Sequence, residues 1–156
     1  MFENIIKNVH NRHPLIHCIT NYVSINDCAN IVLACGGAPI MAEDINEVSQ
    51  ITSICQGLDI NIGMLNDNKL SSMLKAGATA NELGIPVILD PVGAGSSDYR
   101  IKAVQNLMSN VQFGVIRGNV SEIKAIAEKQ GIHNIAAGVY ETMQKNKSAM
   151  GVEAGI

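Results

Sequence analysis

The sequence alternates between two hydrophobic periods, and this alternation limits the folds that are open to it. Segments with apolar residues at helical spacing separate short apolar runs, and the clearest such segment is residues 68–83, which Gly84 ends. The apolar runs, which read as buried strands, are residues 15–19, 58–62, 86–89 and 113–116. Strands and helices in alternation are typical of parallel sheets. We therefore expect an α/β fold with a largely parallel sheet and helices on both faces.

Further elements follow from weaker patterns. Ser24 is a good N-cap for a helix over residues 25–35. The other expected helices are residues 2–9, 46–56, 99–108 and 121–128, and residues 38–41 form a very short apolar piece. We expect residues 1–156 to form a single α/β domain, in which residues 130–156 are a less regular tail with a helix near 140–147.

Composition excludes several classes of function. With 47% apolar and 16% charged residues the chain is not intrinsically disordered. A net charge of −3 argues against nucleic-acid and anionic-membrane partners, and the lack of Trp argues against base stacking. No apolar run approaches the roughly 20 residues of a membrane span. The four cysteines show no CxxC spacing, so we expect a reduced, cytoplasmic protein.

Ligands of parallel sheets bind where the strands end, at their carboxyl edge. The strongest signal at such a place is the loop at residues 90–97, in which Asp90 ends a buried strand and small residues follow. Glycines let backbone N–H groups approach an anion, and an aspartate there can hold Mg²⁺ between phosphates. The loop fits neither common nucleotide-binding pattern. Phosphate binding and a plain strand-to-helix turn both remain open.

A second signal is the segment after the strand at residues 113–116. Arg117 can reach a phosphate with its forked donors, and Glu122 can join Asp90 at a metal. The alternative is a capping box, with Asn119 as the N-cap and Glu122 at the third helical position. The capping box explains Asn119 and Glu122 but leaves Arg117 unexplained.

Other strand ends offer weaker signals. His17 and Cys18 are neighbours, but adjacent strand residues point to opposite faces, so they are not expected to form a catalytic pair. Asn21 is the better candidate for a hydrogen bond to a small ligand. Met41 suits either the core or an apolar wall of a ligand site, and Gly63 either offers backbone groups to a ligand or only turns the chain.

Five motifs in order resemble those of the hydroxyethylthiazole kinases, thiamine-salvage enzymes of the ribokinase-like superfamily. They are HPLIHCITNYVSINDCAN, GGAPIMAED, LDINIG, GIPVILDPVGAG and VIRGNVSEI, and the resemblance covers about residues 14–127. The resemblance implies transfer of the γ-phosphoryl group of ATP to the hydroxyl of 4-methyl-5-(2-hydroxyethyl)thiazole, with Mg²⁺. It also implies a homotrimer for the full-length family, with the thiazole sites between subunits.

The resemblance assigns roles to eight residues. The residues expected near the thiazole alcohol are Asn21, Val23, Met41 and Gly63. Arg117 and Asn119 are expected at ATP, and the acids Asp90 and Glu122 near the metal and phosphates.

One family motif is missing from the sequence. The family carries a second glycine-rich motif, G-[TA]-G-C, whose Cys lies at the reacting hydroxyl, whereas all four cysteines here precede Asp90. The resemblance therefore assigns no catalytic residue to this chain. We expect an N-terminal part of the fold with very weak turnover alone, because one lost oxyanion donor costs about 10²–10³ in rate. The alternatives are a non-catalytic thiazole-binding module, a degenerate remnant, and a related kinase such as one for hydroxymethylpyrimidine.

Overall fold

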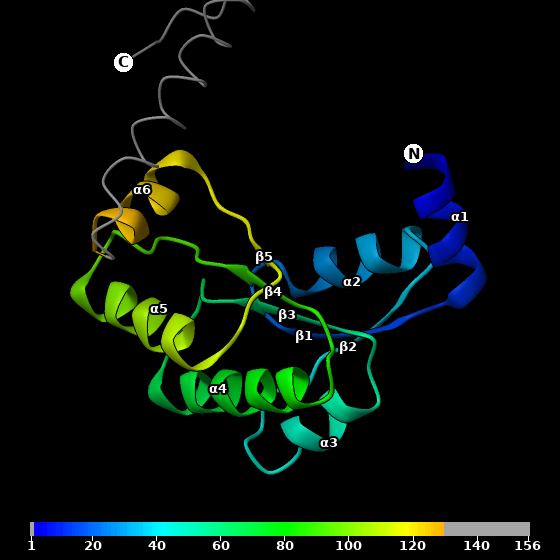
Figure 1. Ribbon diagram of the computed structural model, residues 1–156, viewed down its shortest axis with the longest axis horizontal. Coiled ribbons are helices and arrows are strands. Elements are labelled where there is room, and N and C mark those ends of the chain that lie inside the picture. The colour runs from blue at the N-terminus through cyan, green and yellow to red at the C-terminus, as the bar shows by residue number, and fades with distance from the viewer. Residues whose placement is uncertain (1, 130–156) are drawn as a thin grey trace, which may run out of the picture.

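The computed structural model describes residues 2–129, in which helices and strands alternate from end to end (Figure 1). The helices are α1 (Phe2–Arg12), α2 (Ile25–Ala34), α3 (Val48–Ser53), α4 (Asp67–Glu82), α5 (Asp98–Asn110) and α6 (Val120–Lys129). The strands are β1 (Leu15–Ile19), β2 (Ala38–Ile40), β3 (Gly57–Asn61), β4 (Val87–Asp90) and β5 (Val115–Ile116). The tail expected at residues 130–156, with its helix near 140–147, lies outside the described residues.

The five strands form one sheet in the order β2-β1-β3-β4-β5, and every neighbouring pair is parallel. In Figure 1, α1 and α2 lie on one side of this sheet and α3, α4 and α5 on the other. The expected α/β fold, a parallel sheet with helices on both faces, is therefore confirmed. The strand expected at residues 113–116 is shorter, because β5 pairs with β4 only through Val115 and Ile116.

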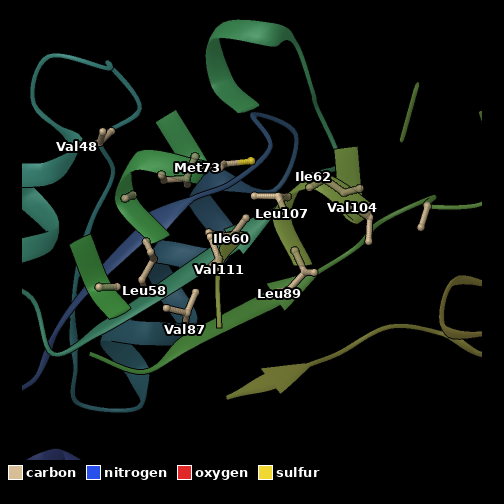
Figure 2. Packing of buried hydrophobic residues seen from close by; sticks show 14 of the residues in the cluster. Val48, Leu58, Ile60, Ile62, Met73, Val87, Leu89, Val104, Leu107 and Val111 are labelled. Atoms are coloured by element: carbon tan, nitrogen blue, oxygen red, sulfur yellow. The ribbon is translucent and has the colours of Figure 1, made fainter. Parts of the chain in front are cut away.

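The hydrophobic core lies between the sheet and α4 and α5, as Figure 2 shows. Alternate residues of β3 and β4 point into it, and they meet Met73 of α4 and Leu107 of α5. The sheet residues concerned are Leu58, Ile60, Val87 and Leu89. Helix α4 approaches Val111 closely because residue 77 is glycine. A Cβ atom there would lie 2.5 Å from a methyl carbon of Val111. The stripe expected on residues 68–83 is the buried face of α4.

The opposite face of the sheet is only partly covered in the described part of the chain. Cys18 is buried, but Ile88 is 39% and Val115 52% exposed. Asp59 lies between them in the sheet, because it pairs in register with Cys18 on β1 and with Ile88 on β4. The pKa of Asp59 is raised to about 6, chiefly by burial and additionally by the Asp90 carboxylate, while Arg117 opposes the shift.

A carboxylate in this place makes stability depend on pH. The folded-state pKa of Asp59 lies above its unfolded value, so the folded protein binds more protons between pH 3.8 and about 6. Its contribution to stability is complete below that window and is lost as the pH rises through it. We expect Asp59→Asn to match the wild type near pH 4 and to be more stable by on the order of 2 kcal/mol at pH 7.

Urea denaturation of both proteins at a series of pH values measures this difference. Taking the difference between variant and wild type removes the contributions of other titrating groups, such as His17. The control is Glu82→Gln, which removes an exposed carboxylate at the end of α4. A difference between Asp59→Asn and the wild type that stays constant from pH 4 to pH 7 would contradict the prediction.

Candidate functional site

A row of polar side chains crosses the carboxyl edge of the sheet in strand order. It begins at Asn21, just after β1, whose amide nitrogen lies 3.3 Å from Oδ1 of Asn61 at the end of β3. The Asn61 amide in turn donates to Oδ2 of Asp90 at the end of β4 over 3.0 Å. Arg117, just after β5, completes the row with an ion pair to the same oxygen at 3.0 Å. One residue from each of four neighbouring strand ends thus forms a continuous network.

Local hydrogen bonds fix the first half of this row. Oδ1 of Asn21 accepts from the backbone N–H and the hydroxyl of Ser24, so Asn21 organises the entry to α2. Ser24 stands at the N-cap position as expected, but its side chain makes no capping hydrogen bond, and its hydroxyl donates to Asn21. Asn61 accepts from the N–H of Gly63 over 2.8 Å.

Gly63 is required by the close approach of the two asparagines. A Cβ atom at residue 63 would lie 2.9 Å from Nδ2 of Asn21 and 2.9 Å from Oδ1 of Asn61. Since Cβ atoms do not approach other heavy atoms so closely, any side chain here pushes the two amides apart. The sequence left two interpretations of Gly63 open, and the structure supplies a third physical reason for glycine, which is room for the amide pair.

Asp90 is the acid at the centre of the edge. Burial raises its pKa above the ordinary value, Arg117 lowers it, Glu122 raises it and the hydrogen bond from Asn61 lowers it; the net shift is upward. The Arg117 side chain is 76% exposed and that of Asp90 18%, so the guanidinium reaches in from solvent. Both hydrogen bonds that the Asp90 side chain accepts from the described residues go to Oδ2.

Glu122 connects the glycine-containing loop at residues 90–97 to α6. One of its oxygens accepts from the N–H of Gly93 over 2.9 Å, and the other accepts from the N–H of Asn119 over 2.8 Å. Asn119 Oδ1 accepts from the N–H of Glu122, which completes the capping box weighed from the sequence. Gly93 has a φ of 65°, in the left-handed region that favours glycine.

The metal roles of Asp90 and Glu122 stay predictions. The two carboxylates are close enough for Glu122 to raise the pKa of Asp90. Within residues 2–129 no group of three or more acidic, His or Cys side chains forms a site that could hold a metal ion by itself. Mg²⁺, however, commonly takes one or two carboxylates together with phosphate and water oxygens, and this donor set suits it.

The segment after β2 is held by a buried histidine. His17 has no exposed surface; its Nε2 donates to the carbonyl of Ala42 over 2.8 Å, and its Nδ1 lies 2.9 Å from the Thr52 hydroxyl. Burial lowers the pKa of His17 despite the opposing effects of that carbonyl and of Glu47. Met41, half-buried, precedes the anchored residue, so His17 fixes the backbone beside it.

Two other sequence expectations concern residues 18 and 23. Burial, followed by the charge of Asp59 and then the neighbouring Cys28 and Cys55, raises the pKa of the Cys18 thiol to about 12. The thiol therefore stays protonated at neutral pH, and His17 bonds elsewhere, as the opposite directions of the two side chains predicted. Val23, two residues after Asn21, is 89% exposed, so its side chain faces outward from the described part of the chain.

Arg100 is a site residue that the sequence did not reveal. From the start of α5 its Nη1 donates to the carbonyls of Ile62 and Val92 over 2.7 and 2.8 Å, and its Nη2 donates to that of Gly63 over 2.8 Å. One guanidinium thereby joins the loop after β3 to the loop after β4. An arginine three residues after an N-cap serine carries no pattern that indicates such contacts.

We expect Arg100→Met to destabilise the fold, because three carbonyls lose a charged donor. The loss in free energy of unfolding should be about 2–3 kcal/mol, as for hydrogen bonds to charged groups. Urea denaturation measures it. Lys102→Met is the control, since it removes an exposed cation from the same helix. Equal stability of the two variants would show that the three bonds contribute nothing.

None of the helices within residues 2–129 is long and apolar enough to cross a bilayer. The geometry shows an α/β protein with a row of polar side chains at the carboxyl edge of its sheet. Comparison with known proteins gives the family. The hydroxyethylthiazole kinase family matches residues 6–154, so the chain belongs to that family.

Individual relatives agree. A hydroxyethylthiazole kinase of Clostridium acetobutylicum is 61% identical over 132 residues, which are 85% of this chain and 48% of the relative. That of Clostridium beijerinckii is 47% identical over 98% of this chain and 54% of the relative. The solved structure of a hydroxyethylthiazole kinase protein from Pyrococcus horikoshii OT3 has a TM-score of 0.80 and 39% identity, over 85% of this chain and 52% of that one. The chain thus spans about half the length of these relatives.

Proposed function

We propose that this chain takes part in the ATP-dependent phosphorylation of 4-methyl-5-(2-hydroxyethyl)thiazole. The single observation that supports this most is the polar row at the carboxyl edge, because it joins the two ends that such a reaction needs. Its Asn21 end carries amides suited to a small neutral alcohol, and its Asp90 and Arg117 end carries charges suited to phosphates. Membership of the hydroxyethylthiazole kinase family supports the choice of substrate.

The thiazole alcohol is proposed to bind at the ends of β1 and β3, where a neighbouring subunit of the trimer contributes the end of its β2. The Asn21 amide and the backbone of Gly63 provide hydrogen bonds, while Val23 and Met41 provide apolar contact with the ring. The Asn61 hydrogen bond to Asn21 orients that amide, and Arg100 fixes the Gly63 carbonyl. Binding in this way holds the hydroxyl toward Asp90, one strand further along the edge.

The phosphates of ATP are proposed to lie between Arg117, Asn119 and the loop that follows Asp90. Mg²⁺, when bound, would be held by Asp90 and Glu122 and would neutralise charge on the phosphates. In the reaction the hydroxyl oxygen forms a bond to the γ-phosphorus, the bond from that phosphorus to the bridging oxygen breaks, ADP leaves, and the hydroxyl proton passes to solvent. Arg117 stabilises negative charge on the transferred group.

A second candidate is a thiazole-binding module without catalysis. It is favoured by one observation: the amide pair at the alcohol end is assembled by hydrogen bonds of the protein itself, with Asn21 bonded to Asn61 and Asn61 to the N–H of Gly63. We further propose a cytoplasmic protein, since all four cysteines are free, and, for the full-length family, a homotrimer as the resemblance implies.

Calorimetry distinguishes the candidates. The thiazole alcohol is titrated into the protein with and without Mg-ATP, and phosphorylated product is measured by mass spectrometry. Product formation supports the kinase, and thiazole binding without nucleotide binding supports the module. Binding of neither ligand would contradict both.

Gly63→Ala tests the alcohol end. We expect its affinity for the thiazole alcohol to fall by about tenfold or more, because the new methyl group separates Asn21 from Asn61 and a small misplacement is costly at such a site. The matched control is Gly114→Ala, whose Cβ would lie 3.7 Å from the Val87 carbonyl, an ordinary contact. Unchanged affinity of Gly63→Ala for the thiazole alcohol would show that the Asn21 and Asn61 amides take no part in binding it.

Asp90→Asn tests the phosphate end. We expect affinity for Mg-ATP to fall by about tenfold or more, because Mg²⁺ loses a carboxylate ligand, while affinity for the thiazole alcohol changes little. Asp98→Asn is the control, as it removes an exposed carboxylate at the start of α5. Equal affinity for Mg-ATP in Asp90→Asn and the wild type would contradict the metal role.

A further inference from the structure

Lys69 is a buried cation that the proposed reaction does not use. It lies in the first turn of α4, and its side chain is only 3% exposed. Lysines are rarely buried to this extent unless they are paired, because removing an ammonium group from water is costly. The groups around it therefore indicate what it does.

Three groups from two loops surround the ammonium of Lys69. It donates to the carbonyl of Thr20, just after β1, over 2.5 Å. It forms an ion pair with Oε2 of Glu43, after β2, at 2.8 Å. It also lies 4.5 Å from the centre of the Tyr22 ring, within the range of a cation–π interaction.

The loops are also joined directly. The Tyr22 hydroxyl donates to Oε1 of Glu43, so Lys69, Glu43 and Tyr22 each contact the other two. Burial acts to raise the pKa of Glu43, but the hydrogen bonds from Lys69 and Tyr22 and the charge of Lys69 outweigh it and lower that pKa. Glu43 therefore stays ionised at neutral pH and keeps the ion pair. We call Lys69, Glu43, Tyr22 and the Thr20 carbonyl the Lys69 cluster.

The Lys69 cluster borders the residues proposed to bind the thiazole alcohol. Thr20 and Tyr22 flank Asn21, and Val23 follows Tyr22 directly. Glu43 is two residues beyond Met41. Fixing the Thr20 carbonyl and the Glu43 carboxylate to one ammonium therefore fixes the separation of the two loops. The loop after β4, at the phosphate end, is held by other groups: Glu122 accepts from Gly93, and Arg100 joins this loop to the loop after β3.

We propose that Lys69 is a positioning residue for the alcohol end of the site: its ammonium ties the loop after β1, which carries Asn21 and Val23, to the loop after β2, which carries Met41, and so fixes the backbone from which these residues contact the thiazole alcohol. This inference rests on the proposed function. It adds a residue outside the five motifs that carry the family resemblance. It predicts that Lys69 affects binding of the thiazole alcohol but not binding of Mg-ATP.

The test compares Lys69→Met with the wild type. Methionine has a similar length and suits a buried site, so the variant removes the charge while keeping the packing. Two measurements are made on each folded protein: amide hydrogen exchange by mass spectrometry, and calorimetric affinity for the thiazole alcohol and, separately, for Mg-ATP. Lys75→Met is the matched control, because Lys75 is an exposed lysine of the same helix whose ammonium bonds to the carbonyl of Ile45.

Lys69→Met is expected to exchange faster at residues 20–24 and 41–44 and to bind the thiazole alcohol about tenfold or more weakly, since displacements of about 1 Å are costly in such sites. Its affinity for Mg-ATP is expected to stay within about twofold. Adding Glu43→Gln to Lys69→Met is expected to cost little more, because both act through the same ion pair. Lys75→Met is expected to resemble the wild type in hydrogen exchange and in its affinities for the thiazole alcohol and for Mg-ATP.

Unchanged exchange in both loops, or equal losses of affinity for both ligands, would overturn the proposal. The exchange measurement needs no ligand. If the wild type bound no thiazole alcohol, the proposed function would fail, whereas unchanged exchange in Lys69→Met would refute the role of Lys69 by itself. Should Lys69→Met fail to fold, Glu43→Gln gives a second test, because it removes the charge that pairs with Lys69 from a side chain that is 40% exposed. Glu43→Gln with wild-type exchange in both loops would likewise overturn the proposal.

Discussion

Parallel pairing of β1, β3, β4 and β5 is the constraint on which the site depends. In a parallel sheet all strands end at the same edge, so residues far apart in sequence meet there. Asn21 and Arg117 are almost one hundred positions apart, yet two intervening side chains, Asn61 and Asp90, connect them. The packing of α4 and α5 against one face of the sheet keeps these strands in register, because Leu58, Ile60 and Leu89 are fully or almost fully buried under the two helices. Any change that shifts one strand along its neighbour would break the row.

The sequence predicted the sheet and the helices well, because apolar periodicity and helix stop signals are local properties. It also located the strand ends at which Asn21, Asp90 and Arg117 lie. It could not predict which partners these side chains choose. The capping box around Glu122 was visible as a pattern, but the bond from Gly93 to Glu122 joins segments 29 positions apart. Ser24 shows the same limit, since a nearby Asn21 takes the hydroxyl that the local pattern assigns to the helix.

Three cationic or polar side chains hold backbone carbonyls at the edge, and none of them lies at a strand end. Arg100 and Lys69 reach the loops from the helices, and His17 reaches one from inside β1. Carbonyls are available at every residue, so no sequence pattern indicates which of them a long side chain will reach. Asn21, Asp90 and Arg117 thus lie at strand ends that the sequence pattern locates, while the residues that fix the neighbouring backbone are found only in three dimensions.

The half-covered face of the sheet has a consequence for how copies of the molecule meet. Asp59 lies among Ile88, Val115 and the buried Cys18, and its charge varies around pH 6. An ionised carboxylate makes this face costly to press against another apolar surface, because the charge would lose its water. In acid the group becomes neutral and that cost disappears. The same acid that reduces the stability of the fold at neutral pH therefore favours its colloidal solubility there.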